Sequence, residues 1–261
     1  MRDIIELLGS HRSIRRYSSQ PVDETLLNQI LDAVRQAPTS ANLQSYSIIV
    51  VRDQAKKKLL AEYCGNQVWI EQCPVFLVIC PDLHRLHRVC EIRGYTMKDQ
   101  FIEISLVAIV DASLVAQNIA VAAEASGLGI CMIGGIRNNP DKVCELLKLP
   151  ERVFPLMGVC LGYPDQTPMV KPRLPHELVI HQEEYRDDSL AAVLAEYDRA
   201  IQATGLYDGA HRKLPSPDGR QIPDSDYSWT EHTARRAATN NPATLRAHMR
   251  RFLQDRKIGL D

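Results

Sequence analysis

One long apolar segment, residues 102–126, constrains the fold more than any other feature of the sequence. As a helix it would span about 35 Å at roughly 1.5 Å per residue, enough to cross a whole domain. It is apolar on nearly every face, so we expect protein to surround it. Asp111 and Glu124 are among the few polar residues that interrupt it. Such interruptions suit a helix buried in protein better than one in lipid.

The bulk composition limits the classes of partner. The chain has 261 residues, enough for one large domain or for a core with a smaller appendage. Lys and Arg number 31 against 32 Asp and Glu, so no net field attracts nucleic acid or an acidic membrane. We therefore predict no nucleic-acid and no membrane partner. Any bound anion must be held by a local site.

The cysteines indicate the compartment. There are seven, no C-x-x-C pair occurs, and some, such as Cys80 and Cys160, lie within apolar runs. Buried, reduced thiols of a cytoplasmic protein are the preferred interpretation, with a zinc site as the alternative. The N-terminal residues carry acidic side chains within a short apolar stretch, which is not the pattern of a signal peptide.

Hydrophobic periodicity predicts an α+β protein in which helices outnumber strands. The expected helices lie near residues 3–9, from 23 to before Pro38, from 53 onward, at 102–126 and from 139 or 140 onward. The expected strands are 47–51, 75–80, 130–133 and 153–162. After about residue 181, helix-like pieces near 189–203 and 229–255 flank a Gly/Pro-rich stretch. We therefore predict a core of residues 1–180 and an appendage of residues 181–261 that is not an independent domain.

Two short basic segments are candidate anion sites. The loop from His11 to Arg16 holds four potential cations in six residues, with Ser13 among them. Charge-assisted donors and a hydroxyl are what a phosphate binds. The second segment is Lys171-Pro172-Arg173, in which proline stiffens an extended backbone. The two segments could converge on one phosphate, but each taken alone also fits a solvated surface loop.

A glycine-rich stretch covers residues 127–135. It lacks the third glycine of a Rossmann fingerprint and follows a helix instead of opening one, which argues against a dinucleotide-binding turn. Gly134 and Gly135 would permit close approach of the backbone to a flat ligand, or they form a plain tight turn. The sequence also contains no G-x-S-x-G and no H-E-x-x-H motif.

Together these fragments resemble the nitroreductase-like FMN proteins. The segments that carry the resemblance are SHRSIRRY, APTSANLQSYSIIVVRD, GNQVWIEQCPVFLVICPD, DASLVAQNIAVAAEASGLGICMIGGIRNNP and LKLPERVFPLMGVCLGYPDQTPMVKPRLP. The similarity is greatest to the oxygen-insensitive NADPH nitroreductases and NADPH–flavin oxidoreductases. It covers about residues 5–180 and weakens beyond, where the chain has a longer insert around 214–227.

The resemblance implies a central mixed sheet surrounded by helices, in a homodimer with FMN at the subunit interface. The long central helix would pack in that interface. It also implies ping-pong chemistry, in which NADPH reduces the flavin and the small-molecule acceptor then takes the place of NADP⁺. Nitroaromatics, quinones and free flavins are the expected acceptors. No protein nucleophile and no metal would be needed.

The resemblance also implies site residues. His11 and Ser13 would hold the FMN phosphate with Lys171 and Arg173, and Arg12 would assist them. Arg15 would lie at the N1/O2 edge of the flavin and support the charge of the reduced ring. The other implied flavin contacts are Gln67 at the pyrimidine edge, Ser40, Asn42 and Gln44 beside the ring, and the turn of Ile133, Gly134 and Gly135 near flavin N5.

The extra phosphate of NADPH is expected to bind a basic stretch of the C-terminal region. Arg212 and Lys213 are the candidates, with Arg220 nearby, and a solvated loop is the alternative.

Three other functions stay open. The scaffold could serve another FMN-dependent reaction, such as reductive dehalogenation, enoate reduction or flavin-dependent oxidation. It could bind flavin without turnover, as a redox sensor or an FMN carrier. A dehydrogenase without flavin is the last alternative, which the failed Rossmann pattern disfavours.

Overall fold

The computed structural model describes residues 3–209 and 213–261. Contacts divide the chain into two compact units, described separately below. Unit 1 comprises Met1–Val170 and His248–Asp261, and unit 2 comprises Lys171–Ala247. The contact boundary thus lies ahead of the predicted one at residue 180, and the last residues of the chain return to unit 1. That residues 181–261 do not fold alone stays a prediction.

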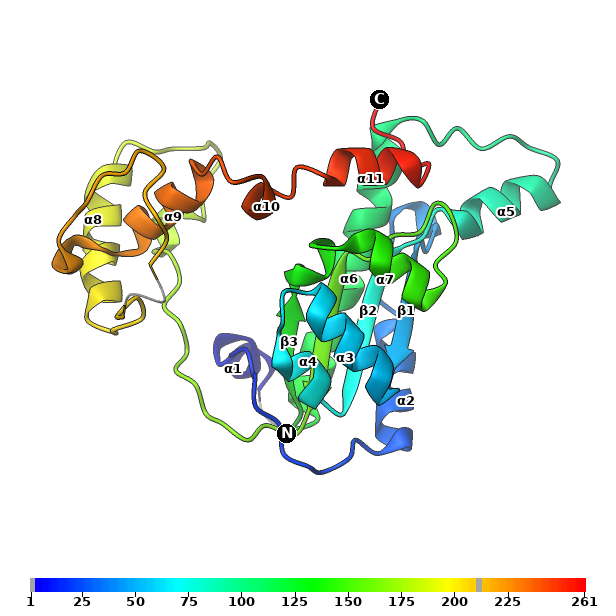
Figure 1. The fold of residues 1–261 in the computed structure, drawn as a ribbon, viewed down its shortest axis with the longest axis horizontal. Helices are drawn as coiled ribbons and strands as arrows, with labels where there is room; N and C mark the ends of the chain where they lie inside the picture. The colour runs from blue at the N-terminus through cyan, green and yellow to red at the C-terminus, as the bar shows by residue number, and fades with distance from the viewer. Residues whose placement is uncertain (1–2, 210–212) are drawn as a thin grey trace. The chain divides into compact units, whose positions relative to one another are not determined.

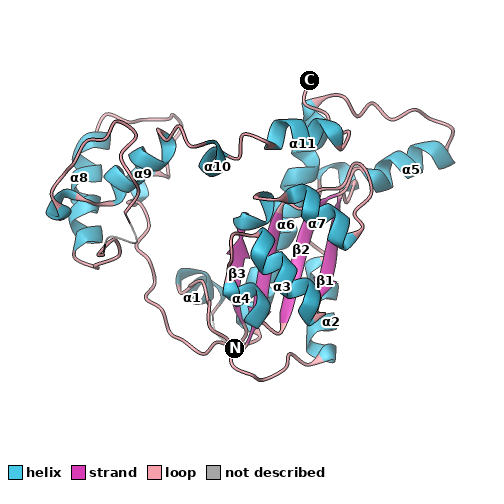
Figure 2. Cartoon of the chain, viewed as in Figure 1, coloured by secondary structure: helices cyan, strands magenta, loops and turns pink. Residues whose placement is uncertain are grey.

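Unit 1 is built on a four-stranded sheet, drawn in magenta in Figure 2. The strands are β1 (Tyr46–Val51), β2 (Val75–Pro81), β3 (Gly129–Ile133) and β4 (Met157–Gly162), in the order β1-β2-β4-β3. All three pairings are antiparallel. The α+β class is confirmed, whereas the predicted mixed character is wrong for these described strands. Strand positions follow from local pattern, but strand direction is set by pairing between distant residues.

Helices cover both faces of this sheet (Figures 1 and 2). β2 is buried along its whole length, and successive side chains point to opposite faces. Phe76 and Val78 belong to one core cluster, and Leu77 and Ile79 to the other. The first cluster is closed by α3 (Gln54–Tyr63), α4 (Val68–Gln72) and α7 (Pro140–Leu147). The second is closed by α2 (Glu24–Val34) and α6 (Ile102–Ala125).

Helix α6 confirms the predicted long central helix. One face is buried through residues such as Ala112, Val115 and Ile119. The opposite face is exposed in the single chain, where Leu106 and Val110 are 47% and 53% accessible. By length and composition alone α6 could cross a membrane, a test that core helices of soluble proteins also pass.

Several elements depart from the predicted bounds. The last strand begins at Met157 and not at 153, because Pro155 has no N–H for a sheet ladder. The helix-like stretch predicted near 229–255 consists of three helices, α9 (Trp229–Ala237), α10 (Pro242–Leu245) and α11 (Met249–Asp255). Asn241 caps α10 and Pro242 begins it. Helix α5 (His84–Ile92) has no buried residue and was not predicted. The remaining α-helices are α1 (Ile4–Gly9) and α8 (Leu190–Gln202).

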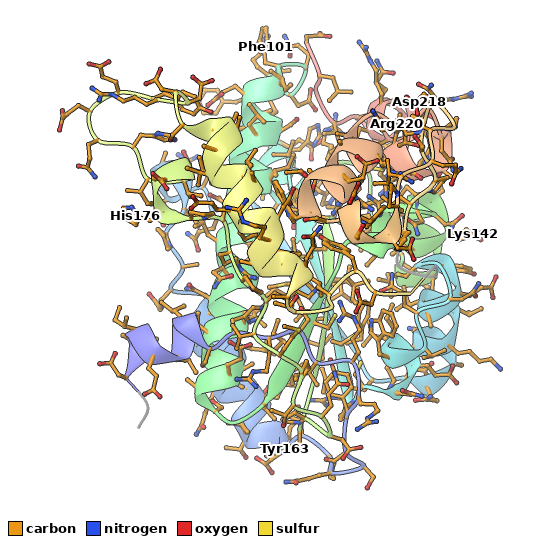
Figure 3. All side chains as sticks on the ribbon, turned by 90° about the vertical axis from the view of Figure 1, so that its left-hand side faces the viewer. Phe101, Lys142, Tyr163, His176, Asp218 and Arg220 are labelled. Carbon is orange, nitrogen blue, oxygen red and sulfur yellow. The ribbon has the colours of Figure 1, made fainter. Side chains whose placement is uncertain are left out.

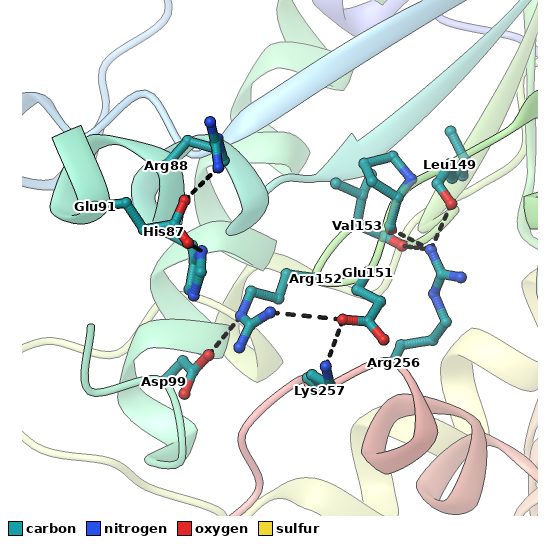
Figure 4. Close-up of polar contacts among 11 residues, drawn as sticks. His87, Arg88, Glu91, Asp99, Leu149, Glu151, Arg152, Val153, Arg256 and Lys257 are labelled. Atoms are coloured by element: carbon teal, nitrogen blue, oxygen red, sulfur yellow. Dashed lines mark hydrogen bonds and ion pairs between the residues drawn. The ribbon is translucent and has the colours of Figure 1, made fainter. Parts of the chain in front are cut away.

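The C-terminal segment is held on unit 1 by charged groups (Figure 4). Lys257 Nζ lies 2.6 Å from Glu151 Oε2, and the Arg152 N–H donates to the Arg256 carbonyl at 2.8 Å. The Arg152 side chain in turn donates from Nε to Asp99 Oδ2 at 2.5 Å. Arg256 donates to the carbonyl of Leu149 at 2.8 Å. The backbone N–H of Ile102 also bonds the carbonyl of Asp261, so the end of the chain closes over the start of α6.

Unit 2 is a small helical unit. Asp198 on α8 accepts hydrogen bonds from the Ser228 hydroxyl and from the Thr230 N–H, which ties the start of α9 to α8. Tyr197 and Trp229 meet edge to face, with centroids 5.6 Å apart. These contacts give unit 2 a core of its own.

Candidate functional site

The basic loop is clamped between two strand ends. Its Ile14 N–H donates to the Ile130 carbonyl at 2.8 Å, and the Ser18 N–H donates to the Tyr163 carbonyl at 2.9 Å. Ile14 is buried, and a Cβ at Gly129 would lie 2.5 Å from its Cγ1. The glycine therefore lets the loop sit tightly on β3.

The predicted phosphate residues of this loop are partly engaged by the protein. His11 Nδ1 lies 2.7 Å from Glu124 Oε1, near the end of α6. Arg12 donates from Nη1 to the Pro168 carbonyl at 3.1 Å. Ser13, the next residue of the loop, is half-buried. The loop is thus a fixed rather than a free basic turn.

Arg15 and Gly135 each contact the segment at the start of α4 (Val68–Gln72). The exposed Arg15 guanidinium lies over the Trp69 ring, 5.5 Å from its centroid. Trp69 belongs to α4, and Gln67 is the residue that precedes that helix. A Cβ at Gly135 would lie 2.3 Å from Gln67 Nε2 and 2.5 Å from the Cys64 carbonyl oxygen.

The turn after β3 gives its two glycines different roles. Ile133 ends β3, and Gly134 and Gly135 open the short helix η2 (Gly134–Arg137). At Gly134 a Cβ would meet only Arg137 Nη2, at 3.4 Å. Gly135 is therefore required by packing inside the protein, whereas Gly134 has space for a side chain. The sequence pattern alone does not distinguish Gly134 from Gly135.

Ser40, Asn42 and Gln44 lie on another loop of unit 1, and all three are exposed. Gln44 Nε2 donates to Asn42 Oδ1 at 3.2 Å. The loop is held by Asp111, which in the sequence stands out only as a polar interruption of the long helix. An acidic residue at an otherwise buried helix position was the available signal for this role.

Lys171 and Arg173 lie in unit 2. They line a cavity of about 1020 Å³ together with Tyr197, Trp229 and His232, among others. The Tyr197 hydroxyl donates to the Pro172 carbonyl at 3.1 Å, which fixes the segment on α8. Burial raises the pKa of Tyr197 and lowers that of His232, so both rings are favoured in their neutral forms. Because the other predicted phosphate residues belong to unit 1, their convergence on one phosphate stays a prediction.

The predicted NADPH residues are only partly visible. Arg212 lies outside the described residues. Lys213 pairs with Asp224, and its Nζ lies 5.5 Å from the centroid of the Tyr227 ring. Arg220 lies beside Asp218 (Figure 3) and 3.8 Å from Glu231. A phosphate would therefore compete with carboxylates for both cations.

Known protein families match most of the chain. The Nitroreductase family profile matches residues 8–163, and the C-terminal domain of the Nitroreductase family matches residues 171–261. A Bacillus subtilis protein named FMN reductase [NAD(P)H] is 42% identical over 204 residues, which is 77% of this chain and 82% of that protein. The oxygen-insensitive NADPH nitroreductase of Salmonella typhimurium is 37% identical over 92% of this chain and 93% of its own.

Solved structures agree. The structure of Bacillus megaterium NfrA2 matches with a TM-score of 0.87 at 33% identity, over 100% of both chains. The NADPH:FMN oxidoreductase of Vibrio harveyi, complexed with NAD⁺, matches with a TM-score of 0.83 at 33% identity, over 97% of both. As its motifs indicated, the chain belongs to the nitroreductase family.

Proposed function

We propose that this protein is an FMN-dependent oxidoreductase that passes electrons from NADPH to small electron-poor acceptors. The observation that carries the proposal is that the residues of the site suit a flavin and that the relatives are named as flavin enzymes. Relatives about 40% identical over more than three quarters of the chain are named FMN reductase and NADPH-flavin oxidoreductase. Nitroaromatics, quinones and free flavins are the proposed acceptors, in a ping-pong reaction.

The residues present fit FMN. A flat ring needs backbone that it can approach closely, and the turn at Gly134 leaves space around its Cα. A flavin also needs a cation near its pyrimidine edge and polar groups for its phosphate. Arg15 is exposed over Trp69, and His11 and Ser13 precede it in the same clamped loop.

We assign the residues as follows. His11, Arg12 and Ser13, with Lys171 and Arg173, bind the phosphate. Arg15 orients the ring and stabilises negative charge on it, because a guanidinium is a permanent cation. Bound FMN supplies the hydride transfer itself. The remaining proposed ring contacts are Gln67, Ser40, Asn42, Gln44, Ile133, Gly134 and Gly135.

NADPH preference is assigned to Arg212 and Lys213. The support for Lys213 is its place in unit 2, where its pairing with Asp224 keeps it positioned until a stronger anion displaces the carboxylate. We also infer a cytoplasmic location, because all seven cysteines are free thiols.

We further infer a homodimer built on α6. Leu106, Val110 and Leu114 recur every four residues and form one exposed apolar stripe on that helix. A second copy would bury the stripe by a self-complementary contact.

The first test of the function is steady-state kinetics with a panel of acceptors. One relative is named CR(VI) reductase and is 38% identical over 80% of this chain, so chromate joins a nitroaromatic, a quinone and free FMN in the panel. We expect parallel double-reciprocal lines, and a KM for NADPH about tenfold below that for NADH. FMN-loaded protein that turns over none of these acceptors would instead support a redox sensor.

The two glycines of η2 provide a matched pair. Gly135→Ala should lower the free energy of unfolding by about 1–3 kcal/mol, because its Cβ would overlap Cys64 and Gln67. Gly134→Ala should change it by less than about 0.5 kcal/mol, yet weaken FMN binding about tenfold. Denaturant unfolding and flavin fluorescence titration measure the two quantities. Wild-type FMN affinity in Gly134→Ala would remove that residue from the flavin site.

The dimer is tested by sedimentation. Wild-type protein should have twice the chain mass of 29.4 kDa. Val110→Lys should shift it toward the monomer, because a charge would replace the apolar contact. Val68→Lys on α4 is the control, since Val68 is 55% exposed, close to the 53% of Val110. A wild-type monomer, or a Val110→Lys protein as dimeric as the control, would contradict the assignment.

A further inference from the structure

A buried carboxylate on α6 organises a distant loop. Asp111 is fully inaccessible to solvent. Its Oδ1 accepts the backbone N–H of Ser40 at 3.0 Å, and its Oδ2 accepts the N–H and the hydroxyl of Ser45 at 3.0 and 2.8 Å. Burying a carboxylate is costly unless its oxygens are hydrogen-bonded. Here three donors from one loop supply those bonds, so Asp111 and the loop depend on each other.

The segment between the two anchor points has a disfavoured backbone. Ala41, Asn42 and Gln44 have φ values of 48°, 57° and 52°, in the left-handed region. Asparagine tolerates this region, but alanine and glutamine adopt it only where the surroundings impose it. Such backbone strain persists where surrounding contacts over-determine it, and it is concentrated at ligand-binding segments.

Arg85 holds the same loop from the other side. Its Nη1 donates to the carbonyls of Gln44 and Tyr46, each at 3.0 Å, and it pairs with Asp82 at 3.1 Å. The loop is therefore fixed by a carboxylate at the N–H groups of Ser40 and Ser45 and by a guanidinium at the carbonyl of Gln44, while the same guanidinium bonds the first residue of β1. The side chains of Ser40, Asn42 and Gln44, in contrast, are exposed.

We propose that Asp111 is a positioning residue that keeps loop 39–45 preformed so that its exposed polar side chains contact the flavin. The proposal rests on the function proposed above. The carboxyl group suits this role because both its oxygens accept hydrogen bonds from the three loop donors. Preforming the loop removes the ordering cost that FMN binding would otherwise carry.

The decisive variant is Asp111→Asn, which preserves size and shape. Its amide has one accepting oxygen, so its NH₂ group must face an N–H of Ser40 or Ser45, donor against donor. Ser105→Ala is the matched control. Ser105 is also buried on α6, 3% exposed, but its hydroxyl bonds the Gly259 carbonyl instead of the loop. Ser45→Ala removes one of the three bonds and serves as the milder variant if Asp111→Asn does not fold.

Three quantities are measured in the full chain. They are amide hydrogen exchange of residues 40–45 without FMN, the Kd for FMN by fluorescence quenching, and the Tm. For Asp111→Asn we expect loop exchange and Kd each to rise about tenfold over Ser105→Ala at a comparable loss of Tm. Ser45→Ala should move both in the same direction by less.

The outcomes separate the positioning role of Asp111 from the proposed function. Loop exchange unchanged from that of the control would overturn the positioning role. Faster exchange with an unchanged Kd for FMN would overturn the flavin role and leave Asp111 as a purely structural residue. Wild-type protein that binds no FMN would refute the proposed function, and with it the flavin role of the loop, whatever the exchange data show.

Discussion

Burial of the central strand on both faces is the constraint on which the rest of unit 1 depends. β2 has no solvent-facing side, so helices must cover both faces of the sheet. α6 is the longest of them, and two of its three acidic residues contact loops of unit 1. Asp111 bonds the loop of residues 40–45, and Glu124 contacts His11 at the start of the basic loop. An apolar helix thus positions, through two carboxylates, two of the loops that carry the proposed flavin residues.

The sequence predicted most of this frame because its signals are local. Short continuous apolar runs marked the strands, and the length of the longest apolar run marked α6. One error arose where local pattern has no bearing, because strand direction depends on long-range pairing. Helix α5 is a different case, since Leu86, Val89 and Cys90 do recur at helical spacing in the sequence, although no residue of this helix is buried. The break of the last predicted helix was readable, since Pro242 stands within it.

The residue types of the candidate site could be predicted from the sequence, but the contacts that these residues make could not. The glycines of the turn suggested close approach of a flat ligand. Only the structure shows that Gly135 is required by Gln67 and the Cys64 carbonyl, while Gly134 is not. The same holds for Asp111, whose acceptor role becomes visible once α6 is placed beside the loop. The resemblance to a known family indicated the cofactor, which composition and motif spacing could not identify.

The central claim is that this chain binds FMN and that NADPH reduces it. The most direct measurement is the visible absorbance spectrum of FMN-loaded protein, recorded anaerobically before and after NADPH, with NADH in parallel. The account predicts flavin bands that bleach rapidly with NADPH and return when an acceptor is added. Protein that cannot be loaded with FMN, or bound flavin that NADPH does not bleach, would contradict it.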